Sequence, residues 1–201
     1  MSSGLRNFAY MNRKSIALFA SGNGSNAVNL IDFFHNHPQI EVKTLVCNKA
    51  DAPVVSKAKI RGIEVLTFTN EEFESGLTVL QELDYRAIDW IILAGFLRKI
   101  PVNIIHGFQD RIINIHPSLL PKFGGKGMYG KYVHQAVIEA KESQSGISIH
   151  LVNEEFDQGK ILAQFKTSVD PEDTCDTLSE KIHQLEHKHF PIIAEQTILN
   201  S

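Results

Sequence analysis

Several features are scarce in this sequence of 201 residues, and each scarcity excludes a class of protein. There are only two cysteines, Cys47 and Cys175, so the chain has neither a disulfide framework nor the closely spaced ligand pairs of a zinc site. We expect free thiols, buried in a reducing compartment, and no bound metal. With 7 prolines, 21% charged and 43% hydrophobic residues, the composition is that of a folded globular protein.

Long apolar runs and an excess of positive charge are also missing. No run approaches the about 18 apolar residues that a membrane-spanning helix needs, and no charged start followed by an apolar stretch marks a secretion signal. Lysine and arginine number 20 against 23 aspartates and glutamates, a net charge of −3. This balance gives no general attraction to the phosphate backbone of a nucleic acid. We therefore expect a cytoplasmic protein with no membrane partner and no nucleic-acid partner.

In the first half of the chain, short apolar runs alternate with amphipathic segments. Runs that are apolar at consecutive positions suit strands buried on both faces, as in a parallel sheet covered by helices on either side. The sequence therefore predicts a mostly parallel, doubly wound α/β fold flanked by helices. Its expected strands are residues 15–20, 42–47, 63–68, 90–94 and 111–115, and its expected helices are residues 27–34, 53–61 and 71–83.

The second half has a different pattern. Two runs in which apolar and polar residues alternate predict a strand pair that closes the sheet, and Asp173 and Thr174 offer caps for a final helix that packs back on it. No linker divides the pattern, so we predict an N-terminal tail at residues 1–13 and a single domain at residues 14–201. The expected elements are a helix at residues 132–141 after a glycine-rich loop, and strands at residues 147–152 and 161–169.

Residues 21–26 (Ser-Gly-Asn-Gly-Ser-Asn) connect the first expected strand to the first helix. The unpaired N–H groups and the positive dipole end of a helix N-terminus favour an anion, and glycines allow it to approach closely. The spacing is not the dinucleotide fingerprint, whose third glycine position holds Ala27, and there is no Walker lysine. The loop therefore indicates a monophosphate site. The alternative is a tight turn in which Ser25 or Asn26 caps the helix.

A polar pair lies at the end of the last expected parallel strand. Asn114 and His116 are two residues apart in an extended segment, so their side chains point to the same face. At the C-terminal edge of a parallel sheet, that face borders the crevice in which open α/β folds bind ligands. An amide donor beside an imidazole suits acyl transfer, in which one group stabilises an oxyanion and the other moves a proton. The alternative is a histidine with only a structural hydrogen bond.

A candidate carboxylate partner lies further along the chain. Asp157 stands in an acidic turn that follows a strand carrying a second histidine, His150. A carboxylate near His116 would raise the pKa of the imidazole and orient its ring. The alternative for Asp157, two residues before Gly159, is a solvated turn.

In their order along the chain, four segments resemble the phosphoribosylglycinamide formyltransferase family, the glycinamide ribonucleotide transformylases. The segments are the 21–26 loop, residues 94–98 (Ala-Gly-Phe-Leu-Arg), residues 114–121 from Asn114 to Pro121, and residues 156–159 (Phe-Asp-Gln-Gly), within a resemblance that runs from about Ser15 to Ile193. The Asn-x-His-Pro-Ser motif and the distal aspartate also occur in other enzymes that use 10-formyltetrahydrofolate. The first loop does more to distinguish the family.

The resemblance implies an activity and a set of site residues. The family transfers the formyl group of 10-formyltetrahydrofolate, its co-substrate, to the primary amine of 5'-phosphoribosylglycinamide in purine biosynthesis. No metal takes part, and we expect a monomer or a homodimer. By this resemblance the catalytic residues are Asn114, His116 and Asp157; the ribonucleotide is bound by Gly24, Ser25, Asn26 and Glu186; and the folate is bound by Phe96, Leu97, Arg98, Lys99, Ile100, Val152, Asn153, Glu154 and Asn114.

The sequence departs from the common family pattern at two places. After residues 119–121 (Leu-Leu-Pro) it carries the loop 123–131 (Phe-Gly-Gly-Lys-Gly-Met-Tyr-Gly-Lys), in which Lys126 and Lys131 either contact phosphate or simply solvate the loop. Gly76 stands where some members place an arginine that contacts folate. The resemblance therefore specifies the folate tail less well than the reaction centre.

The mechanism expected from these residues is direct attack of the amine on the formyl carbon, through a tetrahedral intermediate. Asn114 and a protonated His116 would stabilise the oxyanion, and Asp157 would keep His116 charged. Cys47 stands at the end of another strand with no histidine motif beside it, so we expect no thiol relay. The alternatives are a formyltetrahydrofolate hydrolase, a methionyl-tRNA formyltransferase, and a binding module without catalysis; the two enzymes usually carry a further domain that we do not expect here.

Overall fold

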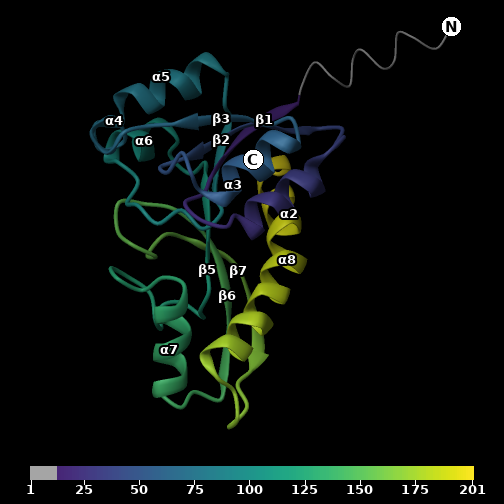
Figure 1. The fold of residues 1–201 in the computed structure, drawn as a ribbon, viewed down its shortest axis with the longest axis vertical. Helices are drawn as coiled ribbons and strands as arrows, with labels where there is room; N and C mark the ends of the chain where they lie inside the picture. The colour runs from purple at the N-terminus through teal and green to yellow at the C-terminus, as the bar shows by residue number, and fades with distance from the viewer. Residues whose placement is uncertain (1–12) are drawn as a thin grey trace, which may run out of the picture.

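A seven-stranded sheet forms the centre of the structure, a computed structural model that describes residues 13–201 (Figure 1). The strand order is β3-β2-β1-β4-β5-β6-β7; the first five strands are parallel, and β6 and β7 are antiparallel. The predicted mostly parallel, doubly wound sheet with a closing strand pair is confirmed. The strands are β1 (Lys14–Phe19), β2 (Ile40–Cys47), β3 (Glu64–Thr67), β4 (Trp90–Leu93), β5 (Ile112–His116), β6 (Gln144–Leu151) and β7 (Ile161–Ser168).

Helices cover both faces of the sheet because the central strands are apolar on both sides. In β1, Ile16 and Leu18 join one core cluster, whereas Ala17 and Phe19 join the other. One face is covered by α2 (Ser25–Phe34), α3 (Pro53–Ile60), α7 (Lys131–Glu139) and α8 (Cys175–Leu199), and the other by α4 (Asn70–Ser75), α5 (Leu77–Tyr85) and α6 (Val102–Gly107).

Two helices differ from the expectation. The helix expected at residues 71–83 is two helices, α4 and α5, because Gly76 between them has a left-handed φ of 68°. A Cβ there would lie 2.3 Å from Oδ1 of Asn103, so a larger residue would have to hold a strained φ and displace the Asn103 side chain. The sequence analysis also missed α6, whose six residues are too short to show a helical period.

The last helix, α8, is the longest in the described chain and supplies one wall of the site. Thr174 caps it, since its hydroxyl accepts the N–H of Thr177 at 3.3 Å. Leu178, Ile182 and Phe190 on its inner face are fully buried. Thr174 thus takes the capping role that we expected of Asp173 or Thr174.

The structure also bears on the cysteines, on membrane-spanning segments and on metal sites. Both cysteines are free; Cys47 is buried as expected, but Cys175 is only half-buried, because it lies at the start of α8. Within residues 13–201, no helix is long and apolar enough to cross a membrane, and no cluster of three or more histidine, cysteine or acidic residues has the arrangement of a metal site. The predicted tail lies outside the described residues except for Arg13, which donates to the carbonyl of Ile40 at 3.2 Å.

Candidate active site

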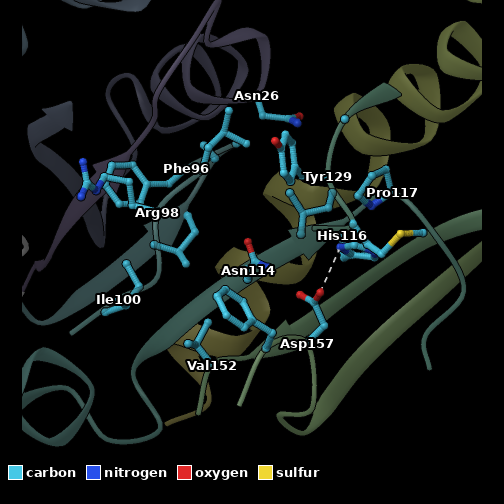
Figure 2. Close-up of a pocket in the computed structure, with 18 of the residues that line it drawn as sticks. Asn26, Phe96, Arg98, Ile100, Asn114, His116, Pro117, Tyr129, Val152 and Asp157 are labelled. Carbon is cyan, nitrogen blue, oxygen red and sulfur yellow. Dashed lines mark ion pairs between the residues drawn. The ribbon is translucent and has the colours of Figure 1, made fainter. Parts of the chain in front are cut away.

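A pocket of about 390 Å³ opens at the C-terminal ends of the parallel strands (Figure 2). It lies where β1 is flanked by β2 and β4, the point at which the strand order reverses and where such sheets bind ligands. The loops after β1, β4 and β5 line it, together with the β6–β7 loop and α8. Every residue that the sequence analysis assigned to the site lines this pocket: Gly24, Ser25, Asn26, Phe96, Leu97, Arg98, Lys99, Ile100, Asn114, His116, Val152, Asn153, Glu154, Asp157 and Glu186.

The glycine-containing loop after β1 brings the N-terminus of α2 to one end of the pocket. Gly24 precedes the helix with a left-handed φ of 71°, and a Cβ on it would lie 2.1 Å from Cγ2 of Val54. In the described structure no side chain caps α2, so the alternative that Ser25 or Asn26 is its N-cap is wrong. The backbone N–H groups of the first turn of α2 therefore have no side-chain acceptor among the described residues, which leaves them available to an anion in the pocket.

Asn26 and Glu186 join α2 to α8 at the same end of the pocket. Nδ2 of Asn26 donates to Oε2 of Glu186 at 2.8 Å, and Glu186 is 6% exposed. Burial raises the pKa of the Glu186 carboxyl; the hydrogen bond from Asn26 and the charge of His183 oppose it. Oδ1 of Asn26 is buried and has no hydrogen-bond partner within the described residues. This end of the pocket therefore holds polar groups that a hydroxyl-bearing ligand would satisfy.

The middle of the pocket holds the three expected catalytic side chains (Figure 2). Asn114 and His116 lie on β5, and Asp157 reaches them from the β6–β7 loop. Oδ2 of Asp157 is 3.6 Å from Nδ1 of His116, and Nε2 of His116 donates to the carbonyl of Phe123 at 2.8 Å. Asp157 has a left-handed φ of 57°, which aspartate tolerates better than most residues. The chain therefore brings together three residues that are up to 43 positions apart (157 − 114).

His116 is not the charged imidazole that the sequence analysis expected. Burial lowers its pKa below the ordinary 6.5; the negative charge of Asp157 and the Phe123 hydrogen bond raise it by less. His116 is therefore neutral at pH 7. Because Nε2–H is committed to a carbonyl, the lone pair of the neutral ring is on Nδ1, facing Asp157. The carboxylate does act on the ring as expected, but desolvation outweighs it.

Asp157 is a charged carboxylate in the structure. Burial acts to raise its pKa, but the contact with His150, the charge of His116 and the N–H of Gly125 together lower the pKa below the ordinary 3.8. Gly125 N donates to Oδ2 at 2.8 Å. The carboxylate thus also anchors the glycine-rich loop that follows β5.

The expected folate segments line the other end of the pocket. Phe96 packs edge-on against Phe19, and Ile100 is buried. Val152 faces them from the β6–β7 loop (Figure 2), where its N–H donates to the carbonyl of Ile112 at 2.9 Å. Arg98 pairs with Glu74 at 2.6 Å and with Asn70. The walls formed by Phe96, Ile100 and Val152 are therefore apolar, whereas Arg98, Lys99, Asn153 and Glu154 add polar groups to this end.

The structure shows where the two departures from the family pattern, Gly76 and the 123–131 loop, lie relative to the pocket. Gly76 is the break between α4 and α5 and does not line the pocket, and neither do Lys126 and Lys131 of the 123–131 loop. Met128 and Tyr129 of that loop do line it, and Tyr129 projects into the space near Asn26 (Figure 2). The glycines on either side allow this loop to turn inward, because Gly125, Gly127 and Gly130 all have positive φ.

Three further histidines line the pocket, and none of them was predicted as a site residue. His134 comes from α7, His150 from β6 and His183 from α8. His183 lies three residues before Glu186 in α8, so once the resemblance had assigned Glu186 to the site, helical spacing would have placed His183 on the same face. No local signal marked His150, since its place depends on the pairing of β6 with β5.

Buried His134 makes the fold sensitive to acid. It is 4% exposed, its Nδ1 has no hydrogen-bond partner in the described structure, and burial, then the charges of His183 and His116, lower its pKa to about 4. The unfolded chain therefore binds this proton more tightly than the folded one. The free energy of unfolding is therefore unaffected by this histidine above pH 6.5. It falls as the pH drops from 6.5 towards 4, because protonation then favours the unfolded chain.

We therefore expect that His134→Gln reduces the loss of unfolding free energy between pH 7.5 and pH 5 by about 2 kcal/mol. Urea unfolding of the parent and of the variant at both pH values measures it. His35→Gln, at an exposed histidine, is the control and is expected to keep the parental pH dependence. Equal losses in the His134 variant and the parent would show that His134 does not carry the acid sensitivity.

The profile of the formyl transferase family matches residues 14–193. The chain belongs to the formyl transferase family. Two similar relatives are phosphoribosylglycinamide formyltransferases: the chloroplastic protein of Arabidopsis thaliana, 42% identical over 89% of this chain and 63% of its own, and that of Bacillus subtilis, 34% identical over 92% of this chain and 95% of its own. The crystal structure of the Bacillus halodurans phosphoribosylglycinamide formyltransferase superposes with a TM-score of 0.83 at 35% identity, covering 91% of this chain and 94% of that one.

This formyl transferase spans 63% and 60% of the length of the two plant relatives, from Arabidopsis thaliana and Vigna unguiculata. Within the family match lie all the residues that line the pocket, from Gly22 to Glu186. The seven-stranded sheet and the pocket thus lie within the part of the chain that matches the family.

Proposed function

We propose that this formyl transferase transfers the formyl group of 10-formyltetrahydrofolate to the primary amine of 5'-phosphoribosylglycinamide. One observation carries the proposal: a single pocket joins the N-terminus of α2, a polar centre of amide, imidazole and carboxylate, and an end with apolar walls. Two substrates of different chemistry can bind at the two ends and meet at the centre. The names of the relatives support the same assignment.

In this proposal the ribonucleotide binds at the end formed by α2 and α8. Its phosphate accepts hydrogen bonds from the backbone of Gly24, Ser25 and Asn26, where the helix dipole favours the negative charge. The sugar hydroxyls meet Glu186 and the unpartnered Oδ1 of Asn26. The amine then extends towards Asn114, in the middle of the pocket.

The folate binds at the apolar end. Its ring lies among Phe96, Ile100 and Val152, where the exclusion of water stabilises an aromatic ligand. Arg98 lies at the rim on the side of the folate tail. The remaining residues proposed for this subsite are Leu97, Lys99, Asn153 and Glu154.

Direct transfer needs an oxyanion donor and a group that moves a proton. When the amine nitrogen attacks the formyl carbon, the carbonyl oxygen becomes negative, and an N–H of Asn114 stabilises it. The neutral His116, with its Nδ1 lone pair beside the carboxylate of Asp157, takes the proton that leaves the amine. The imidazolium then returns this proton to the folate nitrogen as its bond to the formyl carbon breaks. Asp157 stabilises the charge on His116 between the two steps.

The test mixes the full chain with both substrates and follows tetrahydrofolate by absorbance. We expect turnover that requires the ribonucleotide. Equal turnover without the amine would instead indicate a hydrolase, dependence on charged methionyl-tRNA would indicate a tRNA formyltransferase, and binding of both ligands without turnover would indicate a binding module. Thermal unfolding of the same sample controls for folding.

Location and assembly stay predictions. The described chain has no helix able to cross a membrane, and two plant relatives carry names that place them in chloroplasts. We propose a cytoplasmic monomer or homodimer with small-molecule substrates.

A further inference from the structure

The centre of the pocket holds a second imidazole that the reaction as proposed does not use. His150, on β6, is 2% exposed and stands directly opposite Asn114 in the antiparallel pairing of β5 with β6. Its Nδ1 is 2.8 Å from the carbonyl oxygen of Leu151, and its Nε2 is 3.1 Å from Nδ2 of Asn114. The same Nε2 is 3.6 Å from Oδ1 of Asp157. His150 thus lies between two of the three proposed catalytic side chains.

When the ring carries a single proton, these contacts determine which nitrogen holds it. A carbonyl oxygen only accepts, so Nδ1 of His150 donates to Leu151 and carries the hydrogen. In the neutral ring Nε2 then holds the lone pair, and its hydrogen-bond partner is the Asn114 amide at 3.1 Å, because Oδ1 of Asp157 at 3.6 Å lies beyond hydrogen-bond distance. The group that approaches it from Asn114 must be the amide NH₂, not the amide oxygen. The order of donors along the chain of bonds therefore runs from Asn114 through His150 to the backbone of β6.

We propose that His150 is a positioning residue that holds the Asn114 amide with its NH₂ group in the oxyanion site. An amide nitrogen has two hydrogens, so the one given to His150 leaves the second for the developing oxyanion. Without an acceptor at Nε2, the Asn114 amide is free to turn over and present its oxygen, which repels an oxyanion. This inference rests on the proposed formyl transfer, because it assigns the donor of that reaction its orientation.

The first test reads the tautomer and requires no turnover. In protein labelled with ¹⁵N-histidine at neutral pH, long-range ¹H–¹⁵N spectra are expected to show His150 protonated on Nδ1 and unprotonated on Nε2. His150→Gln assigns the signal by its loss. The opposite tautomer, or a ring protonated on both nitrogens, would overturn the proposal whatever the protein catalyses.

The second test separates positioning from mere packing. We expect His150→Ala to lower kcat by about 10- to 100-fold while both KM values change by less than about 3-fold, because a misoriented group slows chemistry more than binding. Glutamine places its amide oxygen near the position of Nε2, whereas asparagine reaches only as far as Nδ1. His150→Gln is therefore expected to recover most of kcat and His150→Asn little of it. Equal kcat values in these two variants would overturn the proposal.

A double-mutant cycle shows whether His150 acts through Asn114. In an Asn114→Ala background, His150→Ala is expected to change kcat by less than about 2-fold, because the group that it positions is gone. A kcat loss in the double variant equal to the product of the two single losses would mean an independent role for His150 and would contradict the inference.

Ser145→Ala is the matched control for folding. It lies on the same strand, at a buried hydroxyl with no hydrogen-bond partner within the described residues. A parent without ribonucleotide-dependent turnover would overturn the proposed function, and the tautomer measurement would still decide the geometry.

Discussion

Asn114→Ala is expected to lower kcat by about 10²- to 10³-fold with little change in either KM. The amide is the neutral donor nearest the point where charge develops on the formyl oxygen, and loss of one such donor costs about 3–4 kcal/mol of transition-state stabilisation. Asn114 also contributes to the folate subsite, but its hydrogen bond strengthens as charge develops on the formyl oxygen, so we expect kcat and kcat/KM to fall together. Steady-state kinetics with each substrate varied in turn measures both.

The controls for this variant separate catalysis from folding and from phosphate binding. Asn114 is partly buried at the pocket wall, and its removal deletes one hydrogen bond, to His150. We expect ribonucleotide binding by calorimetry to stay within about 3-fold of the parent, because the phosphate end does not include Asn114. A kcat within about 3-fold of the parent would remove the amide from the mechanism.

Asp157→Asn is expected to lower kcat by about 10²- to 10⁴-fold. The substitution keeps the shape of the side chain, but it removes the charge that stabilises protonated His116 during the transfer. Gly125 keeps an oxygen acceptor in this variant, so the glycine-rich loop stays anchored and the loss reports on charge. Asp157→Ala removes both the charge and the oxygen that accepts from Gly125, and we expect its kcat to be lower still.

The pH profile gives an independent check on Asp157. Because burial lowers the pKa of His116, the acid limb of kcat/KM in the parent is expected below pH 6.5. The negative charge of Asp157 raises that pKa, so Asp157→Asn is expected to move the acid limb to still lower pH. A shift to higher pH, or a profile identical to that of the parent, would contradict the proposed pairing.

Much of the fold follows from local patterns in the sequence. The parallel strands are predicted to within a few residues because each is a short apolar run between turn residues. Burial on both faces makes consecutive positions apolar, which distinguishes these strands from amphipathic helices. The site residues of the parallel half were also predictable, since loops after β1, β4 and β5 reach the same sheet edge. The motif order and the family resemblance added Glu186 and the folate segments.

Other features depend on contacts that no local pattern records. The break at Gly76 reflects the approach of Asn103 from α6, 27 positions away (103 − 76). His150 meets Asn114 because the two residues stand opposite each other in the antiparallel pairing of β5 with β6. The neutral state of His116 follows from burial around β5, which a sequence pattern does not quantify. In each case, tertiary packing decides what the residue does.

The central claim is that one pocket transfers a formyl group directly between two bound substrates. Its most direct test is ¹³C NMR of the full chain with 10-formyltetrahydrofolate labelled at the formyl carbon and with 5'-phosphoribosylglycinamide. The account predicts that the label appears as a formamide on the ribonucleotide amine in proportion to the tetrahydrofolate formed, and that Asn114→Ala slows its appearance. Label that accumulates as free formate in the presence of the ribonucleotide would contradict it.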